Sequence, residues 1–419
     1  MIFENRYGDK IMTDTVNRFL RYVKIDTQSE EGHDTTPSTA KQFDLARLLV
    51  SELEELGAKD VFLDEQLCYV YAKIPSNTDK KCPKLGFIAH MDTSPAVSDE
   101  NVDPVITENY DGKPIKMGDS GLFLDPSEYP DLLKYTGKTI ICTDGRTLLG
   151  GDDKAGVAII MSLVKYMKDH PEFKHGDVSV GFTPDEEVGM GVSGFDIDRF
   201  GADYAYTVDG GPVGSCDFEC FNAASGHVTV TGRSIHPGSA KGLMKNALNI
   251  AAEFHALLPA AERPEYTEKY EGFFHLNDMS GDVESAEMSY IIRDHDKEKF
   301  EARKKQFTAA AEYMNSRYGA GTVKADVRDS YFNMREIILD NFHLVENARQ
   351  AYRNLGIDLL PPDPVRGGTD GATLSFRGLP CPNLSTGGHN MHGRYEFIAA
   401  ESMDTMVEVC REILRIYTN

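Results

Sequence analysis

The hydrophobic residues up to about residue 210 follow two alternating patterns. Apolar residues at 16, 19, 20 and 23 are spaced like one face of a helix, and a second helix is predicted over 37–56, from a proline to the residue before a glycine. Short apolar runs predict strands, because a strand buried on both faces is apolar throughout. Helices that alternate with such strands indicate an α/β fold, in which helices cover both faces of a mostly parallel sheet. The strands are expected at 68–74, 85–89, 178–182 and 204–208, with a further helix at 157–166.

The pattern changes near residue 221. The run NAASGHVTVTG alternates apolar and polar residues, as in a strand with one exposed face. We therefore predict an inserted α+β domain with an antiparallel sheet, residues 221–333, which interrupts an α/β domain formed by residues 1–220 and 334–419. Further strands are expected at 286–293 and 321–331, with helices at 243–258, 296–318, 337–355 and 399–417.

The composition fits a folded protein with an acidic surface. Of the 419 residues, 41% are hydrophobic, so a sizeable core can form. Asp and Glu number 67 against 44 Lys and Arg, which gives a formal net charge of −23. Nucleic acid and anionic membranes attract basic surfaces, and we therefore expect neither as a partner. Some of the carboxylates could instead be buried at a metal, which composition alone does not decide.

We expect a cytoplasmic protein. The first ten residues, MIFENRYGDK, are too charged for the apolar core of a signal peptide. The longest apolar stretch, 157–164, is far shorter than the roughly 20 residues that a membrane-spanning helix needs. The seven cysteines are scattered and form no CxxC pair, so neither a disulfide framework nor a cysteine zinc site is expected, and a reducing compartment fits best.

Several acidic residues and histidines follow predicted buried strands. In open α/β sheets, sites form at the carboxyl ends of strands, so these side chains are expected to meet. Carboxylates brought together repel one another, and a divalent cation relieves this repulsion. Mixed imidazole and carboxylate ligation suits zinc, and also manganese or cobalt. The residues concerned are His90 and Asp92 after LGFIA, Asp152 and Asp153 in LLGGDDKAG, Glu186 and Glu187 after VSVGF, Asp209 after YAYTV, and His389 and His392 in GGHNMHG.

Each of these motifs also has a purely structural explanation. An HxD sequence is common by chance, a Glu-Glu pair often begins a solvated helix, and GDDKAG could be a turn with a helix cap. Spacing alone also leaves open which of His389 and His392 would bind metal. The repeated placement after independent strands favours a site over these separate explanations.

Taken together and in this order, seven motifs resemble the peptidase T family of tripeptide aminopeptidases, which belongs to the co-catalytic zinc exopeptidases. The resemblance spans essentially the whole chain, and YEGFFHL and YIIRD favour this family over related dipeptidases, carboxypeptidases and deacylases. It implies release of the N-terminal residue from tripeptides, a cofactor of two Zn²⁺ per subunit with Mn²⁺ or Co²⁺ as substitutes, and a homodimer formed through the inserted domain. The motifs are HMDTSP (90–95), LLGGDDKAG (148–156), FTPDEEVG (182–189), YTVDGG (206–211), HPGSAKG (236–242), RGGTDGA (366–372) and PCPNLSTGGHNMHG (380–393).

The resemblance also implies roles for single residues. Glu186 is similar to the general base that takes a proton from the attacking water, and Asp92 to the carboxylate that orients His90. Asp153 is expected to be supportive, and His389 is given no role because His392 matches the family's HG position. The metal ligands implied are His90 and Asp209 for one zinc, Glu187 and His392 for the other, and Asp152 between both.

Four residues are candidates for substrate binding. His236 matches a family histidine that can reach the site of the partner subunit, and a plain loop histidine is the competing interpretation. Arg293 and Arg366 are candidates for holding the peptide's terminal carboxylate bidentately, with surface salt bridges as the alternative for both. Asn246 is the weakest candidate. The resemblance further implies that the inserted domain closes over the site as a lid.

Three other functions are compatible with parts of the pattern. Another amide hydrolase, such as a dipeptidase or an N-acyl amino acid deacylase, would share the site and differ in substrate. A metal- or peptide-binding protein without catalysis would be expected to lose the base, whereas this chain keeps Glu186. A cation-buffering protein would need repeated loops such as DxDxDG, which the sequence lacks.

Overall fold

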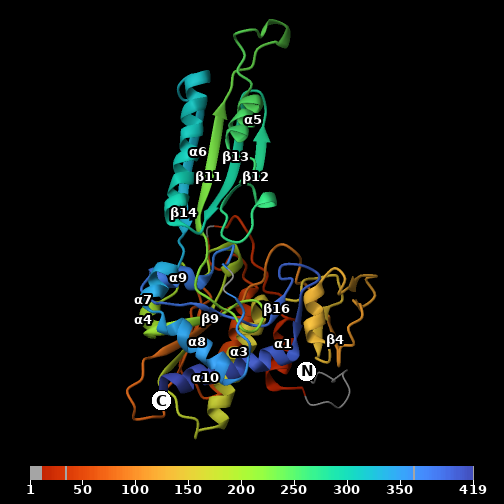
Figure 1. Cartoon of the computed structure of the whole chain (residues 1–419), viewed down its shortest axis with the longest axis vertical. Coiled ribbons are helices and arrows are strands. Elements are labelled where there is room, and N and C mark those ends of the chain that lie inside the picture. The colour runs from red at the N-terminus through yellow and green to blue at the C-terminus, as the bar shows by residue number, and fades with distance from the viewer. Residues whose placement is uncertain (1–11, 34, 362–363, 419) are drawn as a thin grey trace. The chain divides into compact units, whose positions relative to one another are not determined.

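The computed structural model describes residues 12–33, 35–361 and 364–418 (Figure 1). The first ten residues, whose charge argued against a signal peptide, lie outside these ranges. Within them, every helix is too short or too polar to cross a membrane. Contacts group the chain into two compact units. The first comprises Met1–Asp217, Ile337–Pro362 and Leu374–Asn419, and the second comprises Phe218–Glu336 and Asp363–Thr373.

The domain boundaries at 221 and 333 remain predictions. The second unit begins and ends three residues outside these boundaries, at Phe218 and Glu336, and it also includes Asp363–Thr373. Asp363–Thr373 carries the whole RGGTDGA motif, and its Val365 N–H and Gly367 carbonyl pair with the backbone of Glu219 and Phe221.

The first unit is built on a seven-stranded sheet. Its four inner strands, in the order β8, β3, β9 and β15, are parallel, and antiparallel strands complete both edges. The expected strands at 178–182, 85–89 and 204–208 are therefore neighbours, and the expected fold class is confirmed with a mixed sheet. In sheet order the strands are β1 (Lys59–Leu63), β2 (Val70–Ile74), β8 (Val178–Thr183), β3 (Leu85–His90), β9 (Tyr204–Val208), β15 (Asn383–Leu384) and β10 (Cys216–Asp217).

The alternation of side chains along the inner strands gives the sheet two packed faces. On one face, glycines at 86 and 181 leave room for the Phe200 ring, which a methyl group at either position would meet. On the other face, Phe87 stacks on Tyr206, whose hydroxyl donates to the Leu344 carbonyl. The helices of this unit are α1 (Asp14–Tyr22), α2 (Gln42–Glu55), α3 (Gly151–Asp169), α4 (Ile197–Phe200), α8 (His343–Asn354) and α10 (Ala400–Thr418).

A second, four-stranded sheet in this unit was not predicted. Its order is β16, β17, β7 and β4, and all its neighbours are antiparallel. Strands of two to four residues are too short to show a period of two, so no pattern of apolar and polar residues predicts them. The bounds are β4 (Pro104–Thr107), β7 (Ile140–Thr143), β16 (Gly388–His389) and β17 (Phe397–Ala399), with a separate pair formed by β5 (Ile115–Lys116) and β6 (Phe123–Leu124).

Several predicted helices have different bounds in the structure: the helix expected at 157–166 spans Gly151–Asp169, and the one expected at 243–258 spans Ala247–Leu257. For two others the contacts show the reason. The helix expected at 337–355 is interrupted, because α7 (Arg335–Asp340) ends before Asn341 and α8 begins at His343. The Asn341 side chain donates to the Ile337 carbonyl, a bond that competes with continued helix. The helix expected from residue 37 begins only at Gln42. Ser38 donates its N–H and its hydroxyl to the Asp185 carboxylate and does not take part in the helix.

The second unit is an antiparallel sheet covered by two helices. The strand order is β12 (Phe273–Gly281), β13 (Ser285–Asp294), β11 (Asn222–Thr231) and β14 (Val323–Tyr331). Alternate residues of β11 and β13 are buried, and they form one apolar core with Phe254 of α5 (Ala247–Leu257) and Phe307 of α6 (Lys297–Tyr318). Figure 1 shows both helices lying along these strands. The remaining short helices of the chain are α9 (Asp370–Phe376), η1 (Pro130–Tyr135), η2 (Glu186–Val188), η3 (Pro237–Ser239) and η4 (Pro264–Tyr266).

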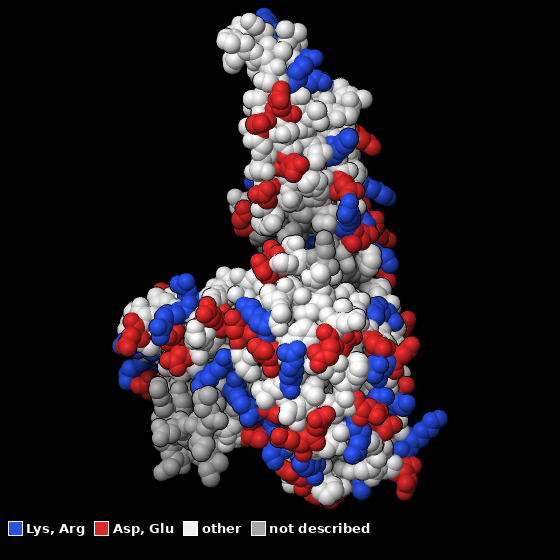
Figure 2. Space-filling view, turned by 180° about the vertical axis from the view of Figure 1, so that it is seen from behind, with Lys and Arg blue, Asp and Glu red and all other residues white. Residues whose placement is uncertain are grey.

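Charged residues of both signs share the surface. On the face drawn in Figure 2, acidic and basic side chains are interspersed. Many of the acidic groups form ion pairs with neighbouring lysines or arginines, such as Asp111 with Lys113 and Glu336 with Lys297. On this face the acidic residues are therefore spread over the surface rather than gathered in one patch.

Candidate metal centre

The carboxylate of Asp152 lies between two histidines of the first unit. Its Oδ1 is 3.0 Å from Nε2 of His90, and its Oδ2 is 3.1 Å from Nε2 of His392. The same nitrogen of His392 is 2.9 Å from Oε2 of Glu187. A carboxylate that offers one oxygen to each of two histidines has the arrangement needed to bridge two cations.

These side chains come from the ends of separate elements. His90 is the last residue of β3, and Asp152 lies in the first turn of α3. Glu187 belongs to η2, which follows the end of β8, and His392 lies in the loop between β16 and β17. Because β3 and β8 are parallel neighbours, their carboxyl ends bring His90 and the Glu187 turn to the same edge of the sheet.

Asp209, directly after β9, belongs to a second group of candidate ligands. One ligand atom each of His90, Asp153 and Asp209 lies within 4.8 Å of the others, and the same holds for His90, Asp152 and Glu187. Asp153 was expected only to support the site. Its carboxylate accepts the backbone N–H groups of His90 and Gly156, both at 3.2 Å, so it also fixes the end of β3 against α3.

One oxygen of Glu187 shows that the site fits a cation. Its Oε1 is buried and has no hydrogen-bond partner among the described residues. The whole Glu187 side chain is only 3% exposed, so water does not replace the missing partner. A buried carboxylate oxygen can only accept, and leaving it unpaired is costly unless a proton or a positive charge compensates it. The donor set of two imidazoles and several carboxylates matches zinc, manganese or cobalt.

The pKa values of the site follow from burial and from close charges. Burial, reinforced by the charge of Asp152, raises the pKa of Glu187 to about 7, and it raises the pKa of Asp209 to about 7 in the same way. Hydrogen bonds to Asp152 and Glu187 raise the pKa of His392 to about 11. The negative charge of the carboxylates is therefore balanced by bound protons or by a charged imidazole. Divalent cations would replace these protons on binding.

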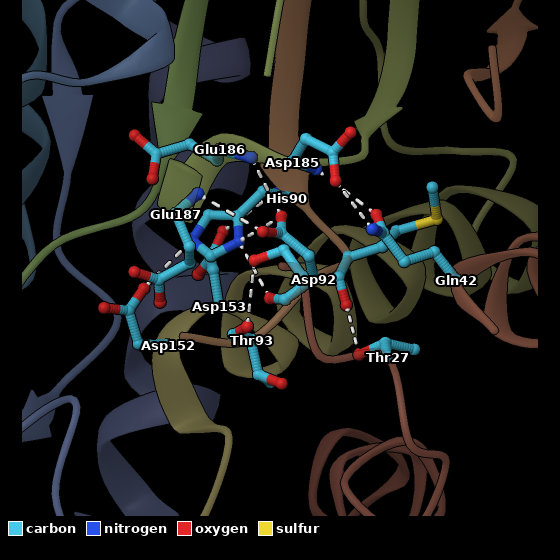
Figure 3. Close-up of polar contacts among 12 residues, drawn as sticks. Thr27, Gln42, His90, Asp92, Thr93, Asp152, Asp153, Asp185, Glu186 and Glu187 are labelled. Atoms are coloured by element: carbon cyan, nitrogen blue, oxygen red, sulfur yellow. Dashed lines mark hydrogen bonds and ion pairs between the residues drawn. The ribbon is translucent and has the colours of Figure 1, made fainter. Parts of the chain in front are cut away.

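Asp92 organises both sides of the cluster (Figure 3). Its backbone carbonyl lies 3.0 Å and its Oδ1 3.3 Å from Nδ1 of His90, the ring nitrogen that faces away from Asp152. Its two oxygens also accept the backbone N–H groups of Glu186 and Glu187, at 3.0 and 3.2 Å. Asp92 therefore lies where it can orient the His90 ring, as the resemblance implied, and it holds the Glu186–Glu187 turn as well.

Glu186 and Glu187 present their carboxylates in different directions. Figure 3 shows the Glu187 side chain extending toward Asp152, whereas the Glu186 side chain takes a separate direction above it. The turn of η2 produces this divergence, since adjacent residues in a 3-10 helix point about 120° apart. A base that is not itself a metal ligand needs such a separate direction.

Asp185 was not predicted and anchors the same turn. Its backbone has a φ of 53°, and its carboxylate accepts the Ser38 N–H, the Ser38 hydroxyl and the Gln42 side-chain amide at 2.6–2.7 Å. Gln42 returns a bond by accepting the Asp185 N–H at 3.2 Å. The only sequence signal was its position beside the Glu-Glu pair, because its partners lie more than 140 residues earlier.

His389, to which no role was given, has a buried ring among aromatic side chains, with its Nδ1 at 3.8 Å from Oδ2 of Asp131. Its ring stacks on Phe397 at 4.7 Å, and its Nε2 is 2.6 Å from the Tyr135 hydroxyl. Burial lowers the pKa of His389 to about 4, so the ring is neutral near pH 7. Among the described residues, its one nearby carboxylate, Asp131, belongs to neither group of candidate ligands, unlike the carboxylates around His392.

The four candidate substrate residues all belong to the second unit and stay predictions. Arg366 donates to the carbonyls of Lys269, Glu271 and Thr267, contacts that an incoming carboxylate would have to replace. Arg293 donates to the Ala224 and Ile292 carbonyls. The list is completed by His236, which is exposed and accepts the Gly238 N–H, and by Asn246, whose side chain caps α5.

A comparison with known proteins identifies the family. Peptidase T of Alkaliphilus oremlandii is 52% identical over 410 residues, which cover 97% of this chain and 100% of that protein. The chain belongs to the peptidase T family. The expected class of enzyme, a metallo-aminopeptidase that hydrolyses peptides, is thereby confirmed.

Two solved structures share the fold of this member of the peptidase T family. Aminopeptidase PepT from Bacillus cereus has a TM-score of 0.76 at 23% identity, covering 97% of this chain and 98% of its own. A tripeptidase from Staphylococcus aureus has a TM-score of 0.77 at 24% identity, covering 98% and 100%. Family profiles described as the peptidase dimerisation domain and as M42 glutamyl aminopeptidase match residues 218–320 and 133–254.

Proposed function

We propose that this member of the peptidase T family releases the N-terminal residue from tripeptides at a centre of two zinc ions, with Glu186 as the general base. The observation that carries the proposal is the Asp152 carboxylate, which offers one oxygen to His90 and the other to His392. The unpaired buried oxygen of Glu187 beside it supports the presence of cations. The tripeptide substrate is supported by the family and by the name of the Staphylococcus aureus relative.

Each of the two ions would be held by three side chains. His90, Asp209 and Asp152 would hold one, and Asp152, Glu187 and His392 the other, with Asp153 adjacent to the first. Zinc, when bound there, polarises a peptide carbonyl and lowers the pKa of a water molecule. Asp92 would keep the His90 ring in the tautomer that leaves Nε2 free to bind metal, since its backbone carbonyl and its carboxylate lie 3.0 and 3.3 Å from Nδ1.

Glu186 would move the proton in the reaction. Its carboxylate would accept a proton from the attacking water, whose oxygen bonds to the carbonyl carbon of the N-terminal residue. The carbon–nitrogen bond then breaks, and the proton passes to the leaving amine. The backbone N–H of Glu186 is fixed by Asp92, so the turn that carries the base is held directly against the residue that orients His90.

The proposed assembly is a homodimer in the cytoplasm. The dimerisation-domain profile covers most of the second unit, and β12 and β14 form the two edges of its sheet. All seven cysteines are free thiols, as suits a reducing compartment.

A panel of peptides combined with metal analysis tests the substrate and the cofactor together. We expect hydrolysis of tripeptides with a free amino terminus, slower or no hydrolysis of di- and tetrapeptides, and about two equivalents of zinc per chain. N-acylated peptides serve as the matched control, because a deacylase would prefer them. A preference for N-acylated substrates, or a protein that is active without divalent metal, would contradict the proposal.

Replacement of the base separates catalysis from metal binding. Glu186→Gln keeps the size of the side chain and removes its ability to accept a proton, so kcat should fall by about 10²–10⁴-fold. Metal content should equal that of the wild type, because Glu186 is not among the proposed ligands. Near-normal turnover in the variant would reject Glu186 as the base.

A further inference from the structure

The buried carboxylate of Glu396 holds the backbone of the turn that carries Asp152. Its Oε2 accepts the N–H groups of Leu149 and Gly150, at 2.8 and 2.9 Å, and its Oε1 accepts the N–H of Asp152 at 3.0 Å. Glu396 is only 1% exposed, so these three bonds satisfy a carboxylate that water does not reach. The position of Asp152 is therefore tied to the position of Glu396.

The two glycines of the LLGGDDKAG motif make this approach feasible. A methyl group built on Gly151 would lie 2.9 Å from Oε1 of Glu396, closer than two such atoms normally pack. Gly150 has a φ of 75°, a backbone conformation that glycine adopts at no steric cost. The motif is thus shaped both to present Asp152 and to receive Glu396.

Glu396 also belongs to the loop that carries His392. This loop connects β16 to β17, and within it the Glu396 N–H donates to the Gly393 carbonyl at 3.3 Å. One residue therefore joins the loop of His392 to the turn of Asp152 through the backbone of each. The side chains of these two residues meet at 3.1 Å, although His392 is 49% exposed and has little packing to hold it.

We propose that Glu396 is a positioning residue for the metal centre, which sets the separation of Asp152 and His392 through the backbone. The proposal rests on the proposed function, since it takes these two residues as metal ligands. The hydrogen bonds of the Glu396 carboxylate go to backbone N–H groups, and not to the side-chain atoms of Asp152 or His392 that would bind metal. Its loss should therefore weaken metal binding without removing a ligand.

Glu396→Gln is the variant that tests the proposal. An amide has one acceptor oxygen and one NH₂ donor, so it cannot accept on both sides, and either Asp152 or the Leu149–Gly150 pair loses its acceptor. We expect zinc affinity to fall by about 10–100-fold, as is usual when a group that orients a ligand is replaced. Affinity is measured by competition with a chromophoric chelator, with the unfolding midpoint recorded in parallel.

Glu401→Gln is the matched control. The Glu401 carboxylate also accepts a backbone N–H, that of Thr139, at 3.0 and 3.1 Å. This bond joins the start of α10 to the residue before β7 and does not involve the Asp152 turn. A general cost of replacing a backbone-bonded glutamate would appear in both variants. We expect the zinc affinity of Glu401→Gln to match the wild type.

The outcomes separate this inference from the proposed function. A folded Glu396→Gln with wild-type zinc affinity overturns the positioning role and leaves the proposed function standing. A wild-type protein that binds no divalent metal overturns the proposed function itself. Should Glu396→Gln fail to fold, Glu396→Asp decides, because it keeps two acceptor oxygens on a shorter side chain: weakened zinc binding supports the inference, and unchanged binding overturns it.

Discussion

His389 and His392 lie three residues apart in the sequence GGHNMHG and have opposite surroundings. His392 reaches the carboxylates of Asp152 and Glu187, whereas His389 stacks on Phe397 and contacts the Tyr135 hydroxyl. A metal ligand must offer a nitrogen toward the other ligands; of these two histidines only His392 faces the candidate ligands, whereas the carboxylate nearest His389 in the described part of the chain is that of Asp131, at 3.8 Å. The family resemblance preferred His392, and spacing alone could not have made that choice.

Replacement of the two histidines should therefore have different effects on metal content. His392→Ala should lose about one of two zinc equivalents, because a site reduced by one of its ligands binds metal more weakly. His389→Gln should keep both equivalents, although loss of its buried contacts should lower the unfolding midpoint. Metal content by plasma mass spectrometry checks both variants, and a loss of zinc in His389→Gln alone would reverse the assignment.

Gly156 sets how closely α3 approaches the end of β9. A methyl group at this position would lie 1.9 Å from the Val208 carbonyl oxygen and 2.5 Å from Oδ1 of Asp153. The residue after Val208 is Asp209, a proposed ligand, so this contact between two elements fixes part of the candidate site. Close packing against Val208 and Asp153 thus requires a glycine at the end of GDDKAG, a constraint that the sequence alone did not reveal.

Gly156→Ala should force α3 and β9 apart. We expect a loss of about 1–3 kcal/mol in the free energy of unfolding, as for overpacked cores, together with reduced zinc content. Urea denaturation and metal analysis measure the two effects. Gly367→Ala is the control, because Gly367 has open space around its Cα and no positive φ, and it should leave both quantities unchanged. Equal stability of both variants would contradict the expected packing.

The order of elements was largely predictable, and their short connections were not. The strands β3, β8 and β9 were expected within one or two residues, because each is a run of buried apolar residues. The second sheet of the first unit was missed, since β16 and β17 are two and three residues long. That omission concerns the site directly, because His392 and Glu396 lie in the loop between these two strands.

The net charge of −23 belongs mainly to the surface of the whole molecule. Asp92, Asp152, Glu186, Glu187 and Asp209 account for five of the 67 acidic residues, and two divalent cations would offset four of those five charges. Most of the acidity is therefore unrelated to the candidate centre. It favours solubility and opposes contact with phosphate-rich partners.

Dimer formation is the prediction that concerns the whole molecule. Light scattering should give a mass of twice the 46.5 kDa of one chain, because the dimerisation-domain profile covers residues 218–320 and a stable two-fold contact uses the same surface on both copies. The mass should persist over a series of dilutions. A mass of 46.5 kDa at every concentration would contradict the proposed homodimer.

The sequence by itself determined the family, the fold class and the acidic residues and histidines that follow the strands. Each of these properties can be inferred from short stretches of sequence, without knowing which distant residues those stretches contact. Only the tertiary structure decided that Asp92 holds the Glu186–Glu187 turn, that Asp185 is anchored by Ser38 and Gln42, and that Glu396 holds the Asp152 turn. The physical reason is separation along the chain: the Glu396 bonds join residues 244 to 247 positions apart, and no local pattern specifies which buried carboxylate will meet which backbone N–H.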